Sequence, residues 1–385
     1  MEKLFLNGMN VGSREGNTFN FFKVDFQARI MEIQPQVVLV FAAEFDIRHY
    51  NVWLHYIQRS KLKFCIVCFS YKYYFHSEKT NHLRTVAPLF SEDTGYRIAD
   101  LGNITSIKAL LYAGNLVRNW EYFYTLPRPE HLNKNIRHVH IGHGDSDKAS
   151  SSVRAQKIYD FTFVADQIAI ERFRNNGINL PQDHFIIIGA PIFPDINVTE
   201  HPSKITSVVY IPTFEGANSL MNYSSLGYLH ETISSIIDRK NIQMLYHPHP
   251  AMGMRVKEYK QVSDGISAKL FNGPVSMSKV EIFNKSDAAL CDVSGVTSEY
   301  LFSCKPIIFP CTEKTVNDIE LNANFRSVCY FWDFEKLHLE DFLRSIASDP
   351  LFEARLSFRN SKFHNVKTFQ ECIDRFDDAL DQVCR

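Results

Sequence analysis

The stretch CDVSGVTSEYLFSCKPIIFP, residues 291–310, decides the fold of this chain. The apolar residues 288–291 lead into a turn of small and polar residues, a helix-compatible segment follows, and Lys305-Pro306 precedes a second apolar run. This order predicts a strand, a turn, a helix and a further strand. Such a turn directs backbone N–H groups out of a helix N-terminus, where phosphate groups bind. The stretch therefore predicts an α/β protein that handles a nucleotide diphosphate, with a strand-to-helix turn that binds nothing as the alternative.

Four positions in this stretch are candidate ligands of the nucleotide. Asp292, Ser294 and Gly295 occupy the predicted turn, where side-chain oxygens and backbone N–H groups face outward. Glu299 lies in the first turns of the predicted helix, where its carboxylate can reach a group attached to the phosphate, such as a ribose.

Length and charge narrow the class of protein. The chain has 385 residues, of which 45% are hydrophobic, and a formal net charge of −1. This length predicts two α/β domains, and the apolar content is typical of globular proteins. A net charge near zero supplies no overall basic field, so nucleic acid is not an expected partner.

No segment of the sequence predicts secretion or a membrane span. Residues 1–17 lack a continuous apolar core, and the apolar run at 37–43 is too short to cross a bilayer. We therefore expect a cytoplasmic protein, and peripheral contact with the inner face of the plasma membrane stays open. Cys65 and Cys68 form an isolated CxxC, which we interpret as buried strand cysteines because a zinc site needs a second pair of ligands. We expect neither a metal nor a cofactor.

Apolar runs alternate with amphipathic segments, which predicts parallel sheets covered by helices. In the first half, candidate strands lie at residues 37–42, 63–69, 107–112, 139–142, 161–165 and 185–188, and candidate helices at 48–60 and 152–159. In the second half, candidate strands lie at 207–211, 242–246, 268–271, 288–291 and 306–309, and a candidate helix at 226–240. Residues 337–385 have a charged helical pattern, and the aromatic residues 70–77 fit either a core strand or a docking site for a lipid or glycan.

A proline-rich break at residues 190–204 is the best candidate linker. It predicts an N-terminal α/β domain at 1–190, a C-terminal α/β domain at 205–345, and a helical segment at 346–385 that packs back towards the N-terminal domain. Two doubly wound domains with parallel sheets place an interdomain cleft at the carboxyl ends of their strands, where ligands bind. The GT-B-like arrangement of many nucleotide-sugar-dependent transferases is the leading candidate for such a chain.

The segment RHVHIGHGDSDKASS, residues 137–151, is the second strong feature. His143 follows a predicted strand, where a histidine faces the expected cleft and can act as a general base on a hydroxyl. Gly144 allows close approach of a ligand or of backbone, and Lys148 can neutralise a phosphate. The alternative is a polar loop in which the histidine only caps a helix.

Two proline-containing strand ends supply the remaining candidates. In YHPHP, residues 246–250, His247 and His249 flank a proline that stiffens the loop, so a histidine can be directed at an oxyanion without reorganisation. In YIPTF, residues 210–214, Thr213 offers a hydroxyl. A His-x-His at a strand end can also bind a metal, but no acidic partner lies nearby in the sequence.

The order of these pieces resembles the CDP-glycerol glycerophosphotransferase family, which includes teichoic-acid primases and polymerases and related bacterial capsule polymerases. The matching positions, in chain order, are His143-Gly144 with Lys148, Gly189-Ala190-Pro191, Tyr210 with Pro212-Thr213, His247-Pro248-His249-Pro250, Asp292 with Ser294 and Glu299, and residues 305–309. His249 takes the place of the motif's histidine, and His247 that of the basic residue before it. The resemblance covers residues 137–310, whereas residues 1–130 match no motif.

Two departures from the family pattern leave the donor and the acceptor open. The stretch between His143-Gly144 and Lys148 is Asp145-Ser146-Asp147, which is far more polar than the usual small and apolar residues. The second serine of the family's Ser-Ser pair is Gly295.

The resemblance implies a GT-B-like transferase that moves a polyol phosphate, with glycerol phosphate as the leading candidate, from a CDP-activated donor to a hydroxyl of a growing cell-surface polymer. CMP would be released, and the acceptor would be a glycan or polyol-phosphate chain, free or lipid-linked. The N-terminal domain would serve the acceptor and the C-terminal domain the donor. The implied roles are the base for His143, pyrophosphate binding for His249, Ser294 and Gly295, ribose binding for Glu299, donor binding for Thr213 and His247, and phosphate binding or loop orientation for Gly144, Lys148 and Asp292.

Three other functions stay open from the sequence. A glycosyltransferase of the same fold would transfer a sugar without phosphorus, and a nucleotide-sugar epimerase would turn over its donor without any acceptor. A non-catalytic scaffold of a capsule assembly complex is the third, against which the complete His143-Gly144…Lys148 and Glu299 pattern argues.

Overall fold

The computed structural model divides the chain into two compact units. The N-terminal unit comprises Met1–Gly144, Ser152–Pro191 and Gln370–Arg385, and the C-terminal unit comprises Asp145–Ser151 and Ile192–Phe369. The structure describes residues 2–6, 9–15, 18–21, 33–41, 51–68, 88–90, 105–113, 136–142, 145, 156–157, 159–199, 204–216, 222–270, 277–319 and 321–385.

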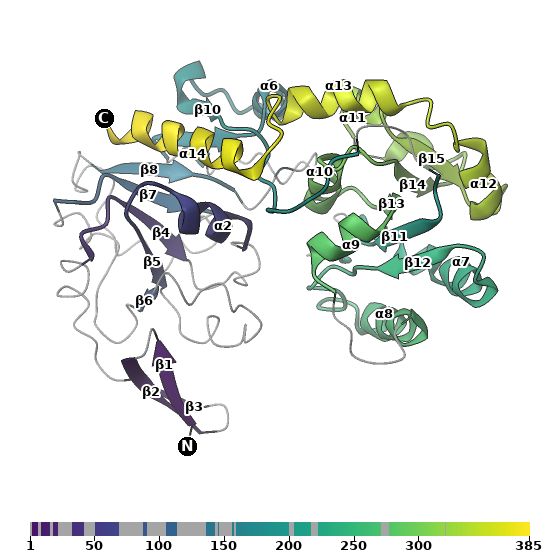
Figure 1. Ribbon diagram of the computed structural model, residues 1–385, viewed down its shortest axis with the longest axis horizontal. Coiled ribbons are helices and arrows are strands. Elements are labelled where there is room, and N and C mark those ends of the chain that lie inside the picture. Colours follow the sequence, from purple (N-terminus) through teal and green to yellow (C-terminus); the bar gives the residue numbers. More distant parts are fainter. Residues whose placement is uncertain are drawn as a thin grey trace. The chain divides into compact units, whose positions relative to one another are not determined.

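The N-terminal unit is built on a parallel sheet with strand order β10-β9-β8-β7-β4-β5-β6 in its described part (Figure 1). These strands are β4 (Val37–Phe41), β5 (Phe64–Cys68), β6 (Pro88–Phe90), β7 (Ala109–Tyr112), β8 (Arg137–His140), β9 (Phe161–Val164) and β10 (Phe185–Ile187). Helices α2 (Asn51–Arg59) and α6 (Gln167–Asn175) and the short 3-10 helix η7 (Gln182–His184) belong to this unit. A separate antiparallel sheet joins β1 (Glu2–Leu6), β2 (Met9–Glu15) and β3 (Thr18–Phe21).

The last helix of the chain, α14 (Phe369–Cys384), completes the core of the N-terminal unit. Its Phe376 ring lies 5.5 Å from that of Trp53 on α2 and 6.2 Å from that of Phe163 on β9. The Asp377 carboxylate accepts a hydrogen bond of 2.9 Å from the backbone N–H of Lys61. These contacts explain why the yellow α14 lies beside the purple and teal elements in Figure 1.

The C-terminal unit contains a parallel sheet with strand order β12-β11-β13-β14-β15. Its strands are β11 (Ser207–Ile211), β12 (Gln243–Tyr246), β13 (Ala288–Cys291), β14 (Ile307–Cys311) and β15 (Tyr330–Asp333). Its helices are α7 (Leu226–Arg239), α8 (Lys257–Leu270), α9 (Lys279–Lys285), α10 (Gly295–Leu301), α11 (Ala323–Arg326), α12 (Leu339–Ser345) and α13 (Phe352–Lys362), with a 3-10 turn η9 (Val316–Asp318).

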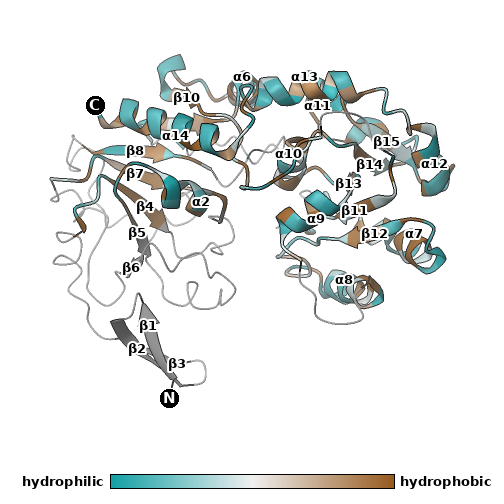
Figure 2. Cartoon of the chain, viewed as in Figure 1, coloured by the Kyte–Doolittle hydropathy of each residue, from teal (hydrophilic) through white to brown (hydrophobic). Residues whose placement is uncertain are grey.

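The strands β11, β13 and β14 are buried along their whole length. Parallel strands covered by helices on both faces carry apolar residues without alternation, as the runs SVVYI, AALC and IIFPC do. The helices are amphipathic, and Figure 2 shows α7 and α14 with both brown and teal positions. This burial fixes the strands, and with them the loops at their carboxyl ends.

The structure confirms the α/β class and most predicted strands, including 207–211 and 288–291 without any shift. The strand predicted at 268–271 is wrong, because residues 268–270 form the last turn of α8. There Tyr259, Val262, Ile266 and Leu270 recur at helical spacing and pack on the core. The strand predicted at 139–142 begins earlier, as β8, and β15 was not predicted.

The remaining sequence-based predictions concern a strand cysteine, two segments of the first half and the C-terminal helices. Cys65 is buried in β5 as expected, and burial raises the pKa of its thiol to about 12. Most of the helix predicted at 152–159 and all of the aromatic residues 70–77 lie outside the described residues. Phe342 is half-buried, whereas the helical positions Ile373 and Phe376 are fully buried.

Candidate functional site

The candidate site lies at the carboxyl edge of the sheet in the C-terminal unit. The strands β12, β11 and β13 are parallel neighbours, so the loops that follow them begin at the same edge. These loops start at His247, Pro212 and Asp292. Ligands of doubly wound folds bind at this edge, because there the loops and helix N-termini meet.

Asp292 orients the loop that follows β11. Its Oδ2 accepts hydrogen bonds from the backbone N–H of Thr213 at 2.8 Å and of Ser225 at 3.1 Å. Thr213 is buried, and the position of its backbone is therefore tied to the end of β13. Of the two roles expected for Asp292, loop orientation agrees with these contacts.

His249 is held by both neighbouring loops. Its backbone N–H donates to the carbonyl of Pro212 at 3.2 Å, and its ring stacks on Phe214 with centroids 4.7 Å apart. The Nδ1 atom accepts the backbone N–H of Ala251 at 3.0 Å. Because Nδ1 acts as an acceptor, the neutral ring carries its proton on Nε2. This N–H can donate a hydrogen bond to a phosphate oxygen.

Glu215 is a buried carboxylate that no sequence motif singled out. It accepts the backbone N–H groups of Gly253 at 3.0 Å, Arg255 at 2.7 Å and Val256 at 3.0 Å. Burial acts to raise the pKa of Glu215, but these N–H groups outweigh it, and the pKa lies below its ordinary value. Glu215 therefore fastens the loop that carries His249 onto the loop that follows β11.

His247 differs from the basic residue whose place it takes. Burial, and then the nearby Lys279 ammonium, lower the pKa of His247 to about 4. The ring is therefore neutral at pH 7 and carries no charge towards a phosphate. The expected donor-binding role of His247 can only be that of a neutral hydrogen-bonding group.

Lys279 supplies the positive charge of this region, and sequence reasoning missed it. Its Nζ lies 2.5 Å from Oε2 of Glu299 and 3.9 Å from the ring centroid of Phe193. The only sequence signal was the capping box formed by Ser278 and Glu281, which starts α9 and places Lys279 in its first turn. Glu299, expected to bind a ribose, is thus already paired with an ammonium group.

Ser294 and Gly295 form the start of α10, as predicted from the turn. The Ser294 hydroxyl lies 3.2 Å from that of Thr297, which donates to the carbonyl of Asp292 at 2.6 Å. A methyl group on Gly295 would lie 3.5 Å from the carbonyl oxygen of Asp145, which is ordinary van der Waals contact. The Asp145 carboxylate in turn forms a buried ion pair with Lys362 at the end of α13.

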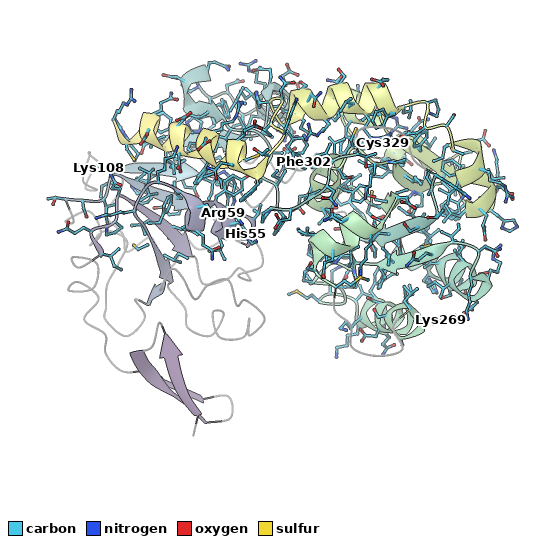
Figure 3. The ribbon with its side chains drawn as sticks, viewed as in Figure 1. His55, Arg59, Lys108, Lys269, Phe302 and Cys329 are labelled. Atoms are coloured by element: carbon cyan, nitrogen blue, oxygen red, sulfur yellow. The ribbon has the colours of Figure 1, made fainter. Side chains whose placement is uncertain are left out.

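The far end of α10 is fixed by buried cations. Arg355 and Arg359 of α13 donate from Nε to the carbonyls of Cys304 at 3.0 Å and Phe302 at 3.1 Å. Figure 3 labels Phe302, over whose ring the Arg359 guanidinium lies at 4.4 Å. Lys305 donates to the carbonyls at the end of α9, including that of Phe283 at 2.8 Å, so this lysine of the family-like motif has a structural role here.

The His143-Gly144…Lys148 motif was the other expected part of the site. His143, Gly144 and Lys148 lie outside the described residues. In the part of the chain that is described, no three His, Cys, Asp or Glu side chains gather as they would around a metal ion. No helix within the described ranges is both long enough and apolar enough to cross a membrane.

The fold defines the class of this protein: two parallel sheets with covering helices, in a GT-B-like α/β chain. No protein-family model matches the chain, and no curated protein matches its sequence. Its fold is similar to that of S. aureus MnaA solved with UDP, with a TM-score of 0.54 and 10% identity over 90% of this chain and 96% of that one.

Two further solved structures share the fold. The wall teichoic acid polymerase TagF gives a TM-score of 0.53 at 12% identity, covering 92% of this chain and 90% of that chain. HepE from Anabaena, solved with UDP and glucose, gives 0.54 at 10% identity, covering 90% of this chain and 100% of that chain. These similarities confirm the GT-B-like prediction.

Proposed function

We propose that this chain is a transferase that moves a polyol phosphate, with glycerol phosphate as the first candidate, from a CDP-activated donor to a hydroxyl of a growing capsule or teichoic-acid-like polymer. Support comes from the order of motifs along residues 137–310 together with the fold. A wall teichoic acid polymerase is among the proteins of similar fold.

The convergence of three loops at one sheet edge is the observation that carries the proposal. Thr213, His249 and Ser294 come from segments far apart in the sequence, and each follows a different parallel strand. The Asp292 and Glu215 carboxylates hold the backbones of these loops in place. Fixed backbone and imidazole N–H groups at such an edge suit a pyrophosphate, since they need no reorganisation when charge develops.

In the proposed reaction, an acceptor hydroxyl oxygen attacks the donor phosphorus that carries the polyol. A new P–O bond forms, and the bond from this phosphorus to the oxygen shared with CMP breaks. CMP leaves with that oxygen, and the hydroxyl proton passes to a base. His249 donates its Nε2–H to the pyrophosphate, Glu299 accepts from the ribose hydroxyls, and Ser294 and Gly295 meet the phosphates.

His143 is the base in this proposal, on the strength of the sequence pattern alone. Gly144 and Lys148 have the orienting roles that the same pattern implies. The acceptor is a glycan or polyol-phosphate chain, and a lipid-linked chain would require peripheral contact with a membrane. The N-terminal unit serves this acceptor, and the C-terminal unit binds the donor.

A thermal-shift panel followed by a transfer assay tests the proposal. CDP-glycerol, CDP-ribitol, CMP, UDP and UDP-sugars are compared first, because a ligand of the native state raises apparent stability. CDP-glycerol with radioactive phosphorus next to the glycerol is then supplied with acceptor. We expect the label in the polymer and unlabelled CMP in solution.

The other outcomes identify the rival functions. Stabilisation by UDP-sugars alone, with transfer of sugar but no phosphorus, would indicate a glycosyltransferase. Donor turnover without acceptor would indicate an epimerase, and no response to any nucleotide would leave a scaffold.

A further inference from the structure

Lys279 is a cation at the donor site that the family-like motifs do not include. Its ammonium group is in contact with the Glu299 carboxylate at 2.5 Å and lies over the Phe193 ring at 3.9 Å. Its side chain keeps 20% of its surface exposed, so a ligand can reach it. The carboxylate and the ring hold the ammonium in one position.

The topology explains why Lys279 lies at the ligand-binding edge. Helix α9 ends at Lys285, just before β13 begins at Ala288. A helix that leads into a parallel strand runs back across the sheet, so its first turn lies at the carboxyl edge. Lys279 occupies that turn, at the same edge as His247 and the start of α10.

We propose that Lys279 binds the phosphate group next to the ribose of the donor nucleotide, in place of the basic residue that precedes Pro-His-Pro in similar sequences. The inference rests on the proposed nucleotide site. A single methylene group links the ribose ring to the 5′-phosphate oxygen, so a carboxylate on the ribose hydroxyls and a cation on the phosphate can be neighbours. Glu299 and Lys279 already have that relation.

The protonation state of His247 agrees with this assignment of Lys279. Burial and the Lys279 charge keep the pKa of His247 near 4, so the histidine in the motif's basic place is neutral at pH 7. Two cations side by side would repel each other, so a nearby lysine favours the neutral form of the His247 imidazole. The pairing with Glu299 also neutralises a carboxylate that would otherwise repel the phosphate.

The test compares the affinities of cytidine, CMP and CDP for the full chain and for Lys279→Met. A hydrogen bond between an ammonium group and phosphate predicts that CMP and CDP bind about 10- to 100-fold more weakly, whereas cytidine changes less than about twofold. Lys279→Arg retains the charge and most of the affinity. Lys285→Met is the matched control on the same helix, since Lys285 is exposed and its Nζ lies 3.6 Å from the sulfur of Met277.

The ratio of cytidine to CMP affinity is the deciding quantity, because partial unfolding weakens both ligands equally. The double variant Lys279→Met/Glu299→Gln removes both charges, so it leaves no unpaired carboxylate and should keep the raised ratio of cytidine to CMP affinity. An unchanged ratio in both variants would overturn the inference, as would a loss confined to CDP, which would assign Lys279 to the second phosphate.

An NMR titration of the imidazole signals tests the proximity independently of nucleotide binding. Removing the Lys279 charge should raise the pKa of His247 above 4, and Lys285→Met should leave it unchanged. An unchanged His247 pKa in Lys279→Met would overturn the inference.

If the wild type binds UMP and UDP but not CMP and CDP, the proposed donor is wrong and the uridine series tests Lys279 in the same way. Binding of cytidine nucleotides with an unchanged ratio contradicts only the role of Lys279, and a wild type that binds no nucleotide contradicts both proposals.

Discussion

Replacing Glu215 by glutamine is expected to destabilise the C-terminal unit and to weaken nucleotide binding at the site. The Glu215 carboxylate accepts three backbone N–H groups, from Gly253, Arg255 and Val256, at 2.7–3.0 Å. Its side chain is fully buried, so water cannot replace a lost partner. The loop it holds also carries His249, whose Nε2–H donates to the pyrophosphate in the proposed function.

The expected loss in the free energy of unfolding follows from the hydrogen bonds that glutamine can keep. Glutamine retains one acceptor oxygen and turns the other into an NH2 group, which faces a backbone N–H. One bond is lost with its donor left unsatisfied, at about 1–3 kcal/mol, and the remaining two lose their charge assistance, at about 1 kcal/mol each. We therefore expect the free energy of unfolding to fall by about 3–5 kcal/mol.

The assay is urea unfolding at pH 7, with Glu258→Gln as the control. Glu258 is exposed in the first turn of α8, where removal of its charge should cost less than about 1 kcal/mol. CMP affinity of the folded Glu215→Gln variant is measured in parallel and should fall. A variant as stable as the Glu258→Gln control would refute the anchoring role of Glu215.

The pH dependence of stability tests the anchoring role of Glu215 a second time. The pKa of Glu215 is held below its ordinary value of 4.5, so the folded state binds its proton less readily than the unfolded state does. The stabilisation is therefore fully present above pH 4.5 and is lost as the pH falls through the lowered pKa. The Glu215→Gln variant should lose less stability than the wild type over this acidic range.

Three further predictions concern the same unit. His249→Ala removes the Nε2–H donor and should lower the transfer rate by about 100-fold or more, measured as label in the polymer with CMP affinity as the control. Gly295→Ala should preserve folding and CMP binding, because among the described residues its methyl group meets only the Asp145 carbonyl oxygen, at 3.5 Å. Gly295→Leu should weaken CDP-glycerol more than CMP, and equal weakening of both ligands would contradict the assignment. Arg355→Met leaves the buried Asp349 carboxylate without its cation and should lower the free energy of unfolding in urea by about 3–5 kcal/mol, most of which the double variant Arg355→Met/Asp349→Asn should restore.

The positions of β11 and β13 were readable from the chain because these two strands are completely buried. The runs VVYI, residues 208–211, and AALC, residues 288–291, are apolar throughout, and they are bounded by polar residues or proline. The prediction failed at residues 268–271, where a short apolar run fits a strand and a helix end equally well. Only the packing of Ile266 and Leu270 on the core decides that this segment is helical.

The candidate ligands were partly readable for a similar reason. Thr213, His249 and Ser294 each follow a predicted strand, and the parallel arrangement brings such positions to one edge. Glu215 was not predicted, because its neighbours along the chain do not indicate that it accepts hydrogen bonds from backbone N–H groups of residues 253–256. Its function depends on contacts across a distance of about forty residues, which the sequence pattern does not encode.

The α/β class, the main strands and the order of the ligand-bearing turns follow from the local periodicity of apolar residues and from turn chemistry, so they could be predicted from the chain. The charge of the groups at the site could not, because it depends on how the chain packs. His247 reads as a basic residue in the sequence, yet burial and the approach of Lys279 make it neutral, and Glu299 is paired with the same lysine. Charge states depend on solvation and on distances through space, which exist only once the strands and helices have packed.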